Sequence, residues 1–447
     1  MVIEALQRKG WVGPCDMLGA AHQSRHNRAQ ASLLNKKHFL KPPSMPDHIL
    51  VLNAGSSSIK FAVFAVAEPL RRTLQGMISG LGSSAVFKAG NDQGPLSGKL
   101  PPGPLNHETA LVWLFDWLDA GNHASRLLAA GHRVVHGGEH YDSPLVVNGQ
   151  NIAKLEALSP LAPLHQPHNL AAIKALRKLR PDLAQIACFD TAFHCTQPVV
   201  AQTLALPQAV TSGGLRRYGF HGLSYEYIAG TLPDHLETAA DSRIIVAHLG
   251  NGASMCAMHN RRSIATTMGF STLDGLVMGT RCGSIDPGVL FYLMHEKGMA
   301  STDVENMLYR QSGLLGLSEI SNDMRTLLDS NAPQARAAID QFVYRAVLEA
   351  GALAAALEGL DALIFTGGIG EHAGREGTFG VVAHRQHTQL LAITQERDLR
   401  AVRRKHWRDV HRGAAGLSRF GAGREIVLID VLGAATRRDI HKPPAVW

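Results

Sequence analysis

The sequence predicts an α/β protein built from two related domains, and three observations support this prediction. Short apolar runs of strand length alternate with helical segments through the middle of the chain. Two strand–turn–strand units, at 49–64 and 244–258, share one plan. The 447 residues, of which 45% are hydrophobic and 18% charged, have the composition of a globular protein with a sizeable core.

The first domain is predicted from a pair of strands and a later helix and strand. Apolar runs at 49–52 and 59–64 are separated by a turn of Asn, Ala, Gly and Ser residues, which is typical of two strands joined by a tight turn. Apolar residues at helical spacing predict a helix over 169–179, ended by Pro181, and the run at 186–189 predicts a strand.

The second domain repeats this pattern further along the chain. A strand is predicted at 244–247, followed by a turn rich in Gly and Asn and by a return strand. The apolar positions of 335–357 predict a long helix that faces the core and ends at Gly359. A further strand over 363–365 leads into a Gly-rich loop.

Composition excludes several classes of protein. The chain contains no run of 18 apolar residues, which argues against a membrane protein. Its five cysteines have no CxxC spacing, so a disulfide framework and a zinc ribbon are disfavoured and a reducing cytoplasm is expected.

The net charge of +7 arises in the two flanks, 1–44 and 375–447, whereas acidic residues predominate between them. Nucleic-acid binding is therefore not expected.

The predicted organisation has four parts. We expect a disordered or mis-annotated extension at 1–45, a first α/β domain at 46–191, a second α/β domain at 192–374 and a divergent segment at 375–447. Met45 would make a natural initiator. The abrupt change of composition after Gly374 suggests the hypothesis that a frameshift altered the last segment.

Small-residue turns follow three of the predicted strands, at 53–58, 248–254 and 366–371. Such turns expose consecutive backbone N–H groups that suit phosphate oxygens, although each alone could be a plain β-turn. None matches the P-loop or the GxGxxG pattern, which disfavours a P-loop NTPase and a Rossmann fold. Three turns together favour a nucleotide cleft.

Two arginines and a histidine have unusual neighbours. Arg133 and Arg281 both lie among small or apolar residues, a setting that a surface arginine does not need. A guanidinium group binds carboxylate or phosphate through two hydrogen bonds, but a structural ion pair is an equally good explanation of either residue alone. His221, flanked by Phe and Gly, would more often be a structural residue than a catalytic one.

Seven motifs, taken together and in this order, resemble the acetate kinase family, which includes propionate kinases and belongs to the actin/sugar kinase/Hsp70 superfamily. They are NAGSSSIK at 53–60, HRVVHGGE at 132–139, FDTAFH at 189–194, RYGFHG at 217–222, HLGNGAS at 248–254, GTRCG at 279–283 and FTGGIGE at 365–371. The resemblance runs from about Pro46 to about Gly374. It implies two duplicated actin/Hsp70-like, ribonuclease H-like domains that flank a nucleotide cleft.

The resemblance also implies an activity, which is reversible phosphoryl transfer from ATP to acetate with Mg²⁺, giving acetyl phosphate and ADP. By the resemblance, the catalytic residues are Arg133, Asp190, His221 and Arg281, and the metal site involves Asn53 and Asp190. The nucleotide would lie near Asn53, Ser56, Ser57, Ser58, Lys60, His248, Asn251, Gly252, Asp323, Met324, Arg325, Gly368, Ile369 and Gly370. The acyl pocket would be formed by Val135, Leu164 and Phe220. A homodimer in the cytoplasm is also implied.

Departures from the family pattern leave alternatives open. Tyr225, Thr272 and Ser284 stand where many members have His, Pro and Asp. The family's C-terminal Glu-Glu segment, with its metal-associated Glu, is not found, and Ile426 to Gly433 stands near its place. The chain could therefore be a nucleotide binder with impaired turnover. Propionate could be the preferred substrate, and a superfamily relative with ATPase or sugar-kinase activity is a third alternative.

Overall fold

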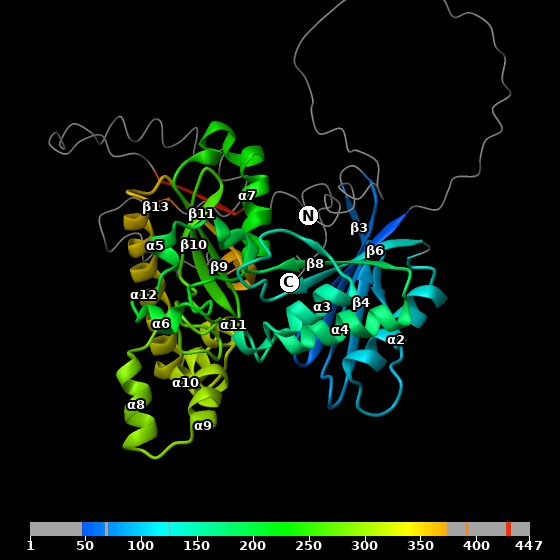
Figure 1. Ribbon diagram of the computed structural model, residues 1–447, viewed down its shortest axis with the longest axis horizontal. Helices are drawn as coiled ribbons and strands as arrows, with labels where there is room; N and C mark the ends of the chain where they lie inside the picture. The colour runs from blue at the N-terminus through cyan, green and yellow to red at the C-terminus, as the bar shows by residue number, and fades with distance from the viewer. Residues whose placement is uncertain (1–46, 68–69, 125, 373–389, 392–425, 431–447) are drawn as a thin grey trace, which may run out of the picture. The chain divides into compact units, whose positions relative to one another are not determined.

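The computed structural model describes residues 47–67, 70–124 and 126–372, together with strand segments at 390–391 and 426–430 (Figure 1). The predicted extension at 1–45, with Met45, lies outside the described residues. So does the segment at 375–447 on which the frameshift hypothesis rests, apart from those two strands.

The chain divides into two compact units. The described residues up to Val134, with 143–159 and 163–188, form the first unit, and 135–142, 160–162 and the described residues from Phe189 onward form the second. The domain limits drawn from the sequence stay a prediction.

An eight-stranded sheet organises the first unit. Its strands are β1 (His48–Ala54), β2 (Ser58–Ala65), β3 (Arg71–Ser79), β4 (Val86–Asn91), β5 (Gly94–Leu96), β6 (Leu127–Val134), β7 (Leu145–Val146) and β8 (Ala184–Phe189). They lie in the order β5-β4-β3-β2-β1-β6-β8-β7, with β1 antiparallel to β2 and parallel to β6. The predicted strands at 49–52, 59–64 and 186–189 are confirmed within β1, β2 and β8.

Helices α2 (His107–Ala120) and α4 (Gln166–Leu179) pack beside each other against this sheet (Figure 1). Helix α2 begins with a capping box, in which Asn106 and Thr109 satisfy each other's backbone N–H groups. Helix α4 contains the predicted helix at 169–179. Shorter elements are α3 (Gly149–Glu156) and a 3₁₀ turn at Ser159–Leu161.

The second unit is built on a six-stranded sheet of the same plan. Its strands are β9 (Ile244–Leu249), β10 (Ala253–His259), β11 (Arg262–Thr266), β12 (Ala362–Thr366), β13 (Leu390–Leu391) and β14 (Ile426–Asp430). The order β11-β10-β9-β12-β14 repeats β3-β2-β1-β6-β8 of the first unit, with an antiparallel pair followed by a parallel neighbour in each. The duplication predicted from the two strand–turn–strand units is confirmed.

Twelve helical segments complete the described part of the second unit. They are Ala192–Thr196 (3₁₀), α5 (Val199–Gln202), α6 (Gln208–Thr211), α7 (Gly222–Leu236), Glu237–Asp241 (3₁₀), α8 (Pro287–His295), α9 (Ser301–Asn306), Met307–Gln311 (π), α10 (Gly313–Ser318), α11 (Met324–Leu328), α12 (Pro333–Ala356) and α13 (Gly367–His372). The long helix predicted at 335–357 is confirmed as α12.

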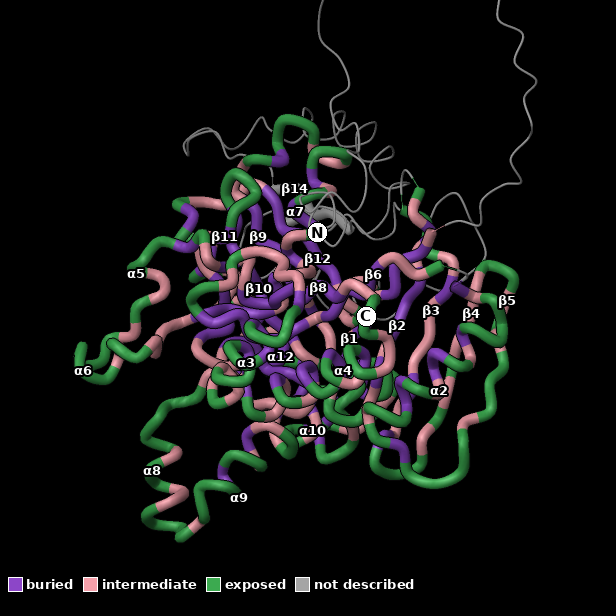
Figure 2. The backbone as a smooth tube through the Cα atoms, turned by 45° about the vertical axis from the view of Figure 1, so that its right-hand side comes forward, coloured by how far each residue is buried: buried purple, intermediate pink, exposed green. Residues whose placement is uncertain are grey.

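Alternate residues of β9 face two different cores, because successive side chains of a strand point to opposite faces. Ile244 and Val246 belong to a cluster with residues of α7, whereas Ile245 and Ala247 belong to a cluster with residues of α12. Figure 2 shows β9 and β10 as buried strands, while α8 runs mostly along the surface. In the part of the chain that the structure describes, no helix is both long and apolar enough to cross a membrane.

One sequence prediction needs correction. The segment after β12 was expected to be a loop, but Gly367–His372 forms the short helix α13. Gly367 has φ of +82°, which lets the chain turn at once out of the strand, and the Glu371 side chain accepts a hydrogen bond from its N–H at 3.1 Å. The Gly-rich composition therefore marks a sharp strand-to-helix turn.

Candidate active site

Three polar side chains lie in a row across the sheet of the first unit. Asn53 on β1 is paired with Lys60 on β2, and the parallel register of β1 and β6 brings Arg133 to its other side. All three residues are partly exposed, whereas the residues beside them, such as Leu52 and His132, are buried on the opposite face. The strand register thus gathers two cations and an amide on one face of the sheet.

The two cations affect each other electrostatically. Partial burial lowers the pKa of the Lys60 ammonium, and the nearby positive charge of Arg133 lowers it further. Like charges held together and partly desolvated are unfavourable unless an anion compensates them. This arrangement is suited to binding a phosphate or carboxylate group.

The turn that follows β1 is fixed by side chains from the helices. Asn169 on α4 is buried and donates to the Ala54 carbonyl at 2.6 Å. The Nε2 atom of His107, at the start of α2, lies 2.7 Å from the Gly55 carbonyl, which requires that this nitrogen carry the proton. With its carbonyls held, the turn leaves Ser56 and Ser57 exposed.

In the second unit, two of the predicted catalytic residues meet at a glycine. A Cβ atom placed on Gly252 would lie 3.4 Å from His221 Nε2 and 3.8 Å from Arg281 Nη1. The imidazole ring of His248 lies 4.5 Å from that of His221, between ring centroids. The structure therefore brings together residues from three separate motifs. His221 adopts the left-handed conformation, with φ of +59°, at the start of α7.

The loop that carries Arg281 is anchored by the Arg281 side chain and by backbone hydrogen bonds. Arg281 Nη1 donates to the Thr272 carbonyl at 3.1 Å, and the Arg281 carbonyl accepts from Met278 N–H at 3.2 Å. The Gly279 N–H donates to the Asn251 carbonyl at 2.9 Å. A Cβ on Gly279 would overlap the Asn251 side-chain oxygen, so a larger residue at 279 would have to displace that side chain.

Asp190 directly follows β8 and is 1% exposed. Its carbonyl accepts a hydrogen bond from Gly222 N–H at 2.8 Å, which ties it to the residue after His221. A carboxylate is a ligand that Mg²⁺ prefers, and Mg²⁺ takes most of its remaining ligands from water and phosphate oxygens. Among the described residues, no three His, Cys, Asp or Glu side chains gather into a ready metal site. The Asp190 carboxylate is of the chemical type that fits Mg²⁺.

The structure also shows the contacts and burial of several other predicted site residues. Asp323 caps α11 by accepting from Arg325 N–H at 2.7 Å, and Met324 is buried in the core. Val135 and Phe220 belong to the same core cluster of the second unit, while Leu164 is a half-buried residue of the first unit. In α13, Gly370 is buried, Ile369 is partly buried and Gly368 is exposed.

A buried histidine that the sequence did not single out holds the backbone before His221. His194 is 1% exposed, and burial lowers its pKa to about 4, so the ring is neutral. Its Nε2–H donates to the Phe220 carbonyl at 2.9 Å, and its Nδ1 lies 2.9 Å from the Ser263 hydroxyl. This pairing fixes the position of the segment that carries Phe220 and His221.

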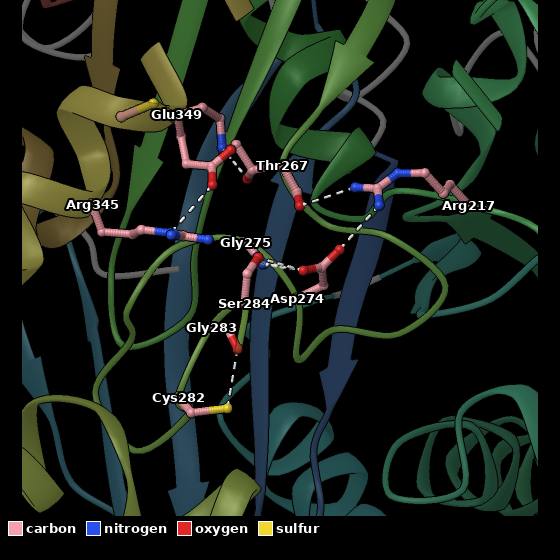
Figure 3. Close-up of polar contacts among 10 residues, drawn as sticks. Arg217, Thr267, Asp274, Gly275, Cys282, Gly283, Ser284, Arg345 and Glu349 are labelled. Atoms are coloured by element: carbon pink, nitrogen blue, oxygen red, sulfur yellow. Dashed lines mark hydrogen bonds and ion pairs between the residues drawn. The ribbon is translucent and has the colours of Figure 1, made fainter. Parts of the chain in front are cut away.

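Asp274 is a second residue that sequence reasoning missed, and it joins the RYGFHG motif to the residue that follows the GTRCG motif (Figure 3). Its carboxylate accepts from Arg217 Nη1 at 3.1 Å and from the Ser284 hydroxyl at 2.5 Å. Gly275 N–H donates to both Asp274 and Ser284. A signal for this role existed, because Asp274 precedes a glycine in a segment rich in small residues close to the Arg281 motif. Ser284 therefore donates a hydrogen bond to the Asp274 carboxylate.

Comparisons with known proteins agree with the motifs. The model of the acetokinase family matches residues 48–400. An acetate kinase of Rhodopseudomonas palustris is 58% identical over 335 residues, covering 74% of this chain and 84% of the relative. An acetate kinase of Nitrobacter hamburgensis is 52% identical over 338 residues, covering 74% and 82%.

Solved structures give the same result. A propionate kinase of Francisella tularensis aligns with a TM-score of 0.73 and 33% identity, over 86% of this chain and 96% of that one. An acetate kinase of Porphyromonas gingivalis aligns with a TM-score of 0.72 and 31% identity, over 88% and 100%. Because the family model covers most of the chain and the curated relatives share more than half of their aligned residues with it, the chain belongs to the acetokinase family.

Proposed function

We propose that this chain transfers a phosphoryl group between ATP and acetate, giving acetyl phosphate and ADP in a reversible reaction. The observation that carries the proposal is the meeting of His221 and Arg281 at Gly252, in the turn between β9 and β10. Phosphoryl transfer depends on alignment and charge neutralisation more than on covalent help, and this arrangement supplies both. Relatives named acetate kinases, at 58% and 52% identity, favour acetate over propionate.

Each predicted catalytic side chain has a role in this proposal. Arg133 and Arg281 bind the substrate carboxylate and neutralise the charge of the transferring group. His221 donates a hydrogen bond to the phosphoryl oxygens. Val135, Leu164 and Phe220 contact the methyl group of acetate, and such an apolar contact discriminates by only about 1–3 kcal/mol per methylene.

Asp190 and Asn53 are proposed to hold Mg²⁺, which would screen the negative charge of the phosphate oxygens when bound. Nucleotide contacts are proposed for the serines of the first turn, for Lys60 and for the second Gly-rich turn. The full set is Asn53, Ser56, Ser57, Ser58, Lys60, His248, Asn251, Gly252, Asp323, Met324, Arg325, Gly368, Ile369 and Gly370. The four cysteines within the described residues are free thiols, which fits our proposal of a cytoplasmic location.

The proposal is tested by measuring acetyl phosphate formed by the purified full-length chain from ATP, Mg²⁺ and acetate, with propionate compared at equal concentration. We expect turnover with both acids and a higher kcat/KM for acetate. The thermal shift caused by ATP is measured in parallel. Stabilisation by ATP without any product would overturn the proposed activity and favour an impaired nucleotide binder.

We also propose that the chain forms a homodimer through α8 and α12. Helix α8 is strongly apolar, yet none of its residues is buried, and Phe291 and Tyr292 are 57% and 51% exposed. On α12, Tyr344 and Leu348 lie four residues apart, so they share one face, and are 59% and 45% exposed. A patch of exposed apolar side chains marks an association surface, and we propose that these side chains contribute to one.

A substitution on α8 tests the dimer. We expect Phe291→Glu to convert a dimer into a monomer in sedimentation-velocity experiments, because a buried unpaired carboxylate opposes association. Val112→Glu, at an exposed apolar position of α2, is the matched control and should leave the sedimentation coefficient unchanged. A wild-type chain that sediments as a monomer at all concentrations would rule out this surface as a dimer interface.

A further inference from the structure

Three side chains from two elements of the second unit form a continuous hydrogen-bonded line. Tyr225 on α7 places its hydroxyl 2.5 Å from the Ser254 hydroxyl on β10. The same Ser254 oxygen lies 2.8 Å from Nδ1 of His221. Tyr225 and Ser254 are both 0% exposed, so neither hydroxyl exchanges its partner for bulk water. The line ends on the ring whose opposite nitrogen, Nε2, faces Gly252.

The direction of these hydrogen bonds follows from the chemistry of the phenol. Burial raises the pKa of Tyr225 well above its ordinary value, so the phenol keeps its proton. That proton needs an acceptor, and Ser254 Oγ lies at hydrogen-bond distance. The phenol also contacts the His248 backbone, and because this contact lowers the pKa of Tyr225, the phenol oxygen accepts in it and its proton remains for Ser254. With its oxygen accepting from Tyr225, Ser254 directs its own proton to His221 Nδ1.

The reverse direction is costly. If His221 Nδ1–H donated to Ser254, one hydroxyl proton in this fully buried site would lose its acceptor. The Ser254 proton would either turn to the Tyr225 oxygen and displace the phenol proton, or, with Ser254 accepting from both neighbours, lose the acceptor that Nδ1 provides. Leaving a buried donor unsatisfied costs about 1–3 kcal/mol. A neutral imidazole that accepts at Nδ1 carries its proton on Nε2.

We propose that Tyr225 and Ser254 are positioning residues that fix His221 as the Nε2–H tautomer and so present a donor beside Gly252 and Arg281. The role of that donor in turnover rests on the proposed function, whereas the tautomer itself does not. The ring is also held on its face by His248, whose Nδ1 lies 2.9 Å from the Ser224 hydroxyl. Tyr225 suits this role because its phenol has one proton to donate, which sets the direction of donation in both hydrogen bonds.

The tautomer is tested in the ligand-free full chain by NMR with ring-¹⁵N-labelled histidine, the His221 signals being assigned by their loss in His221→Gln. We expect the wild type to show Nε2 protonated and Nδ1 unprotonated. Tyr225→Phe and Ser254→Ala should each raise the population protonated at Nδ1. Tyr227→Phe, at an exposed tyrosine of the same helix, is the matched control and should leave the His221 signals unchanged.

Kinetics add a second readout. We expect either variant to lower kcat by about 10- to 100-fold with KM for ATP and acetate changed little, since the donor is misplaced rather than a binding group lost. The double variant should lose no more than the worse single variant, because both act through His221. If the kcat losses of the two single variants multiply in the double variant, or if His221 of the wild type is protonated at Nδ1, the proposed role of Tyr225 and Ser254 is wrong. A wild type without turnover but with the expected tautomer would instead count against the proposed function alone.

Thermal melting of both single variants identifies a variant that has lost its fold. Ser254→Thr, which retains the hydroxyl, should keep the wild-type tautomer.

Discussion

Arg281→Ala is expected to lower turnover by about 10³-fold or more while the second unit stays folded. Removing one cation that neutralises charge in a phosphoryl-transfer transition state typically has an effect of this size. The variant loses the hydrogen bond from Arg281 Nη1 to the Thr272 carbonyl. The loop should nevertheless survive, because the backbone hydrogen bonds of Arg281 and Gly279 do not involve the lost guanidinium. The measurement is kcat for acetyl phosphate formation, with the melting temperature as a check of the fold.

The same loss is expected for Arg133→Ala, with an additional signature in the first unit. Because the charge of Arg133 lowers the pKa of Lys60, its removal should raise the pKa of that ammonium. Chemical modification of Lys60 as a function of pH can follow this change without any turnover. Arg262→Ala, at an exposed position on β11, is the control for both variants and should keep wild-type activity. Near-normal kcat in either active-site variant would refute the proposed roles.

Asp190→Asn should have the second large effect, a loss of about 10³-fold in kcat that added Mg²⁺ does not restore. An amide is neutral and is a poorer ligand for a hard cation than a carboxylate of the same shape. Since the Asp190 carbonyl, rather than its side chain, accepts from Gly222, the contact with the start of α7 should persist.

The measurement for Asp190→Asn is kcat as a function of Mg²⁺ concentration, compared with Asp234→Asn at an exposed position of α7. The control should retain the wild-type Mg²⁺ dependence. An Asp190→Asn enzyme that recovers full activity at high Mg²⁺ would show that the carboxylate contributes only affinity, which contradicts the proposed role in turnover.

The strands and long helices could be predicted because their signals are local. Ile244 to Ala247 are apolar on both faces, which is typical of a strand covered by helices on each side, and α7 and α12 do cover the two faces of β9. The segment after β12 could not be assigned correctly, because glycines are poor helix formers and only the backbone conformation of Gly367 shows that a helix begins there.

The residue types of the candidate site could be predicted from the sequence, but the residues that hold them in place could not. The motif glycines and arginines stood out by their neighbours in the sequence, and the structure brings His221, Gly252 and Arg281 together. Ser254 and Asp274 act through contacts with residues that are far away in the sequence. Ser254 is separated by 33 positions from His221, and Asp274 is separated by 57 positions from Arg217. No periodicity in one sequence encodes such tertiary pairs.

The close approach of Gly279 to Asn251 has a consequence for how this protein can change. A side chain larger than hydrogen at 279 would occupy the place of the Asn251 oxygen, so position 279 can be enlarged only if the Asn251 side chain moves or is shortened. A change at 279 is therefore coupled to a stretch that is remote along the gene, whereas a shorter side chain at 251 leaves Gly279 its space. Anyone who enlarges residue 279 to accommodate a new acceptor will have to rebuild position 251 in the same step.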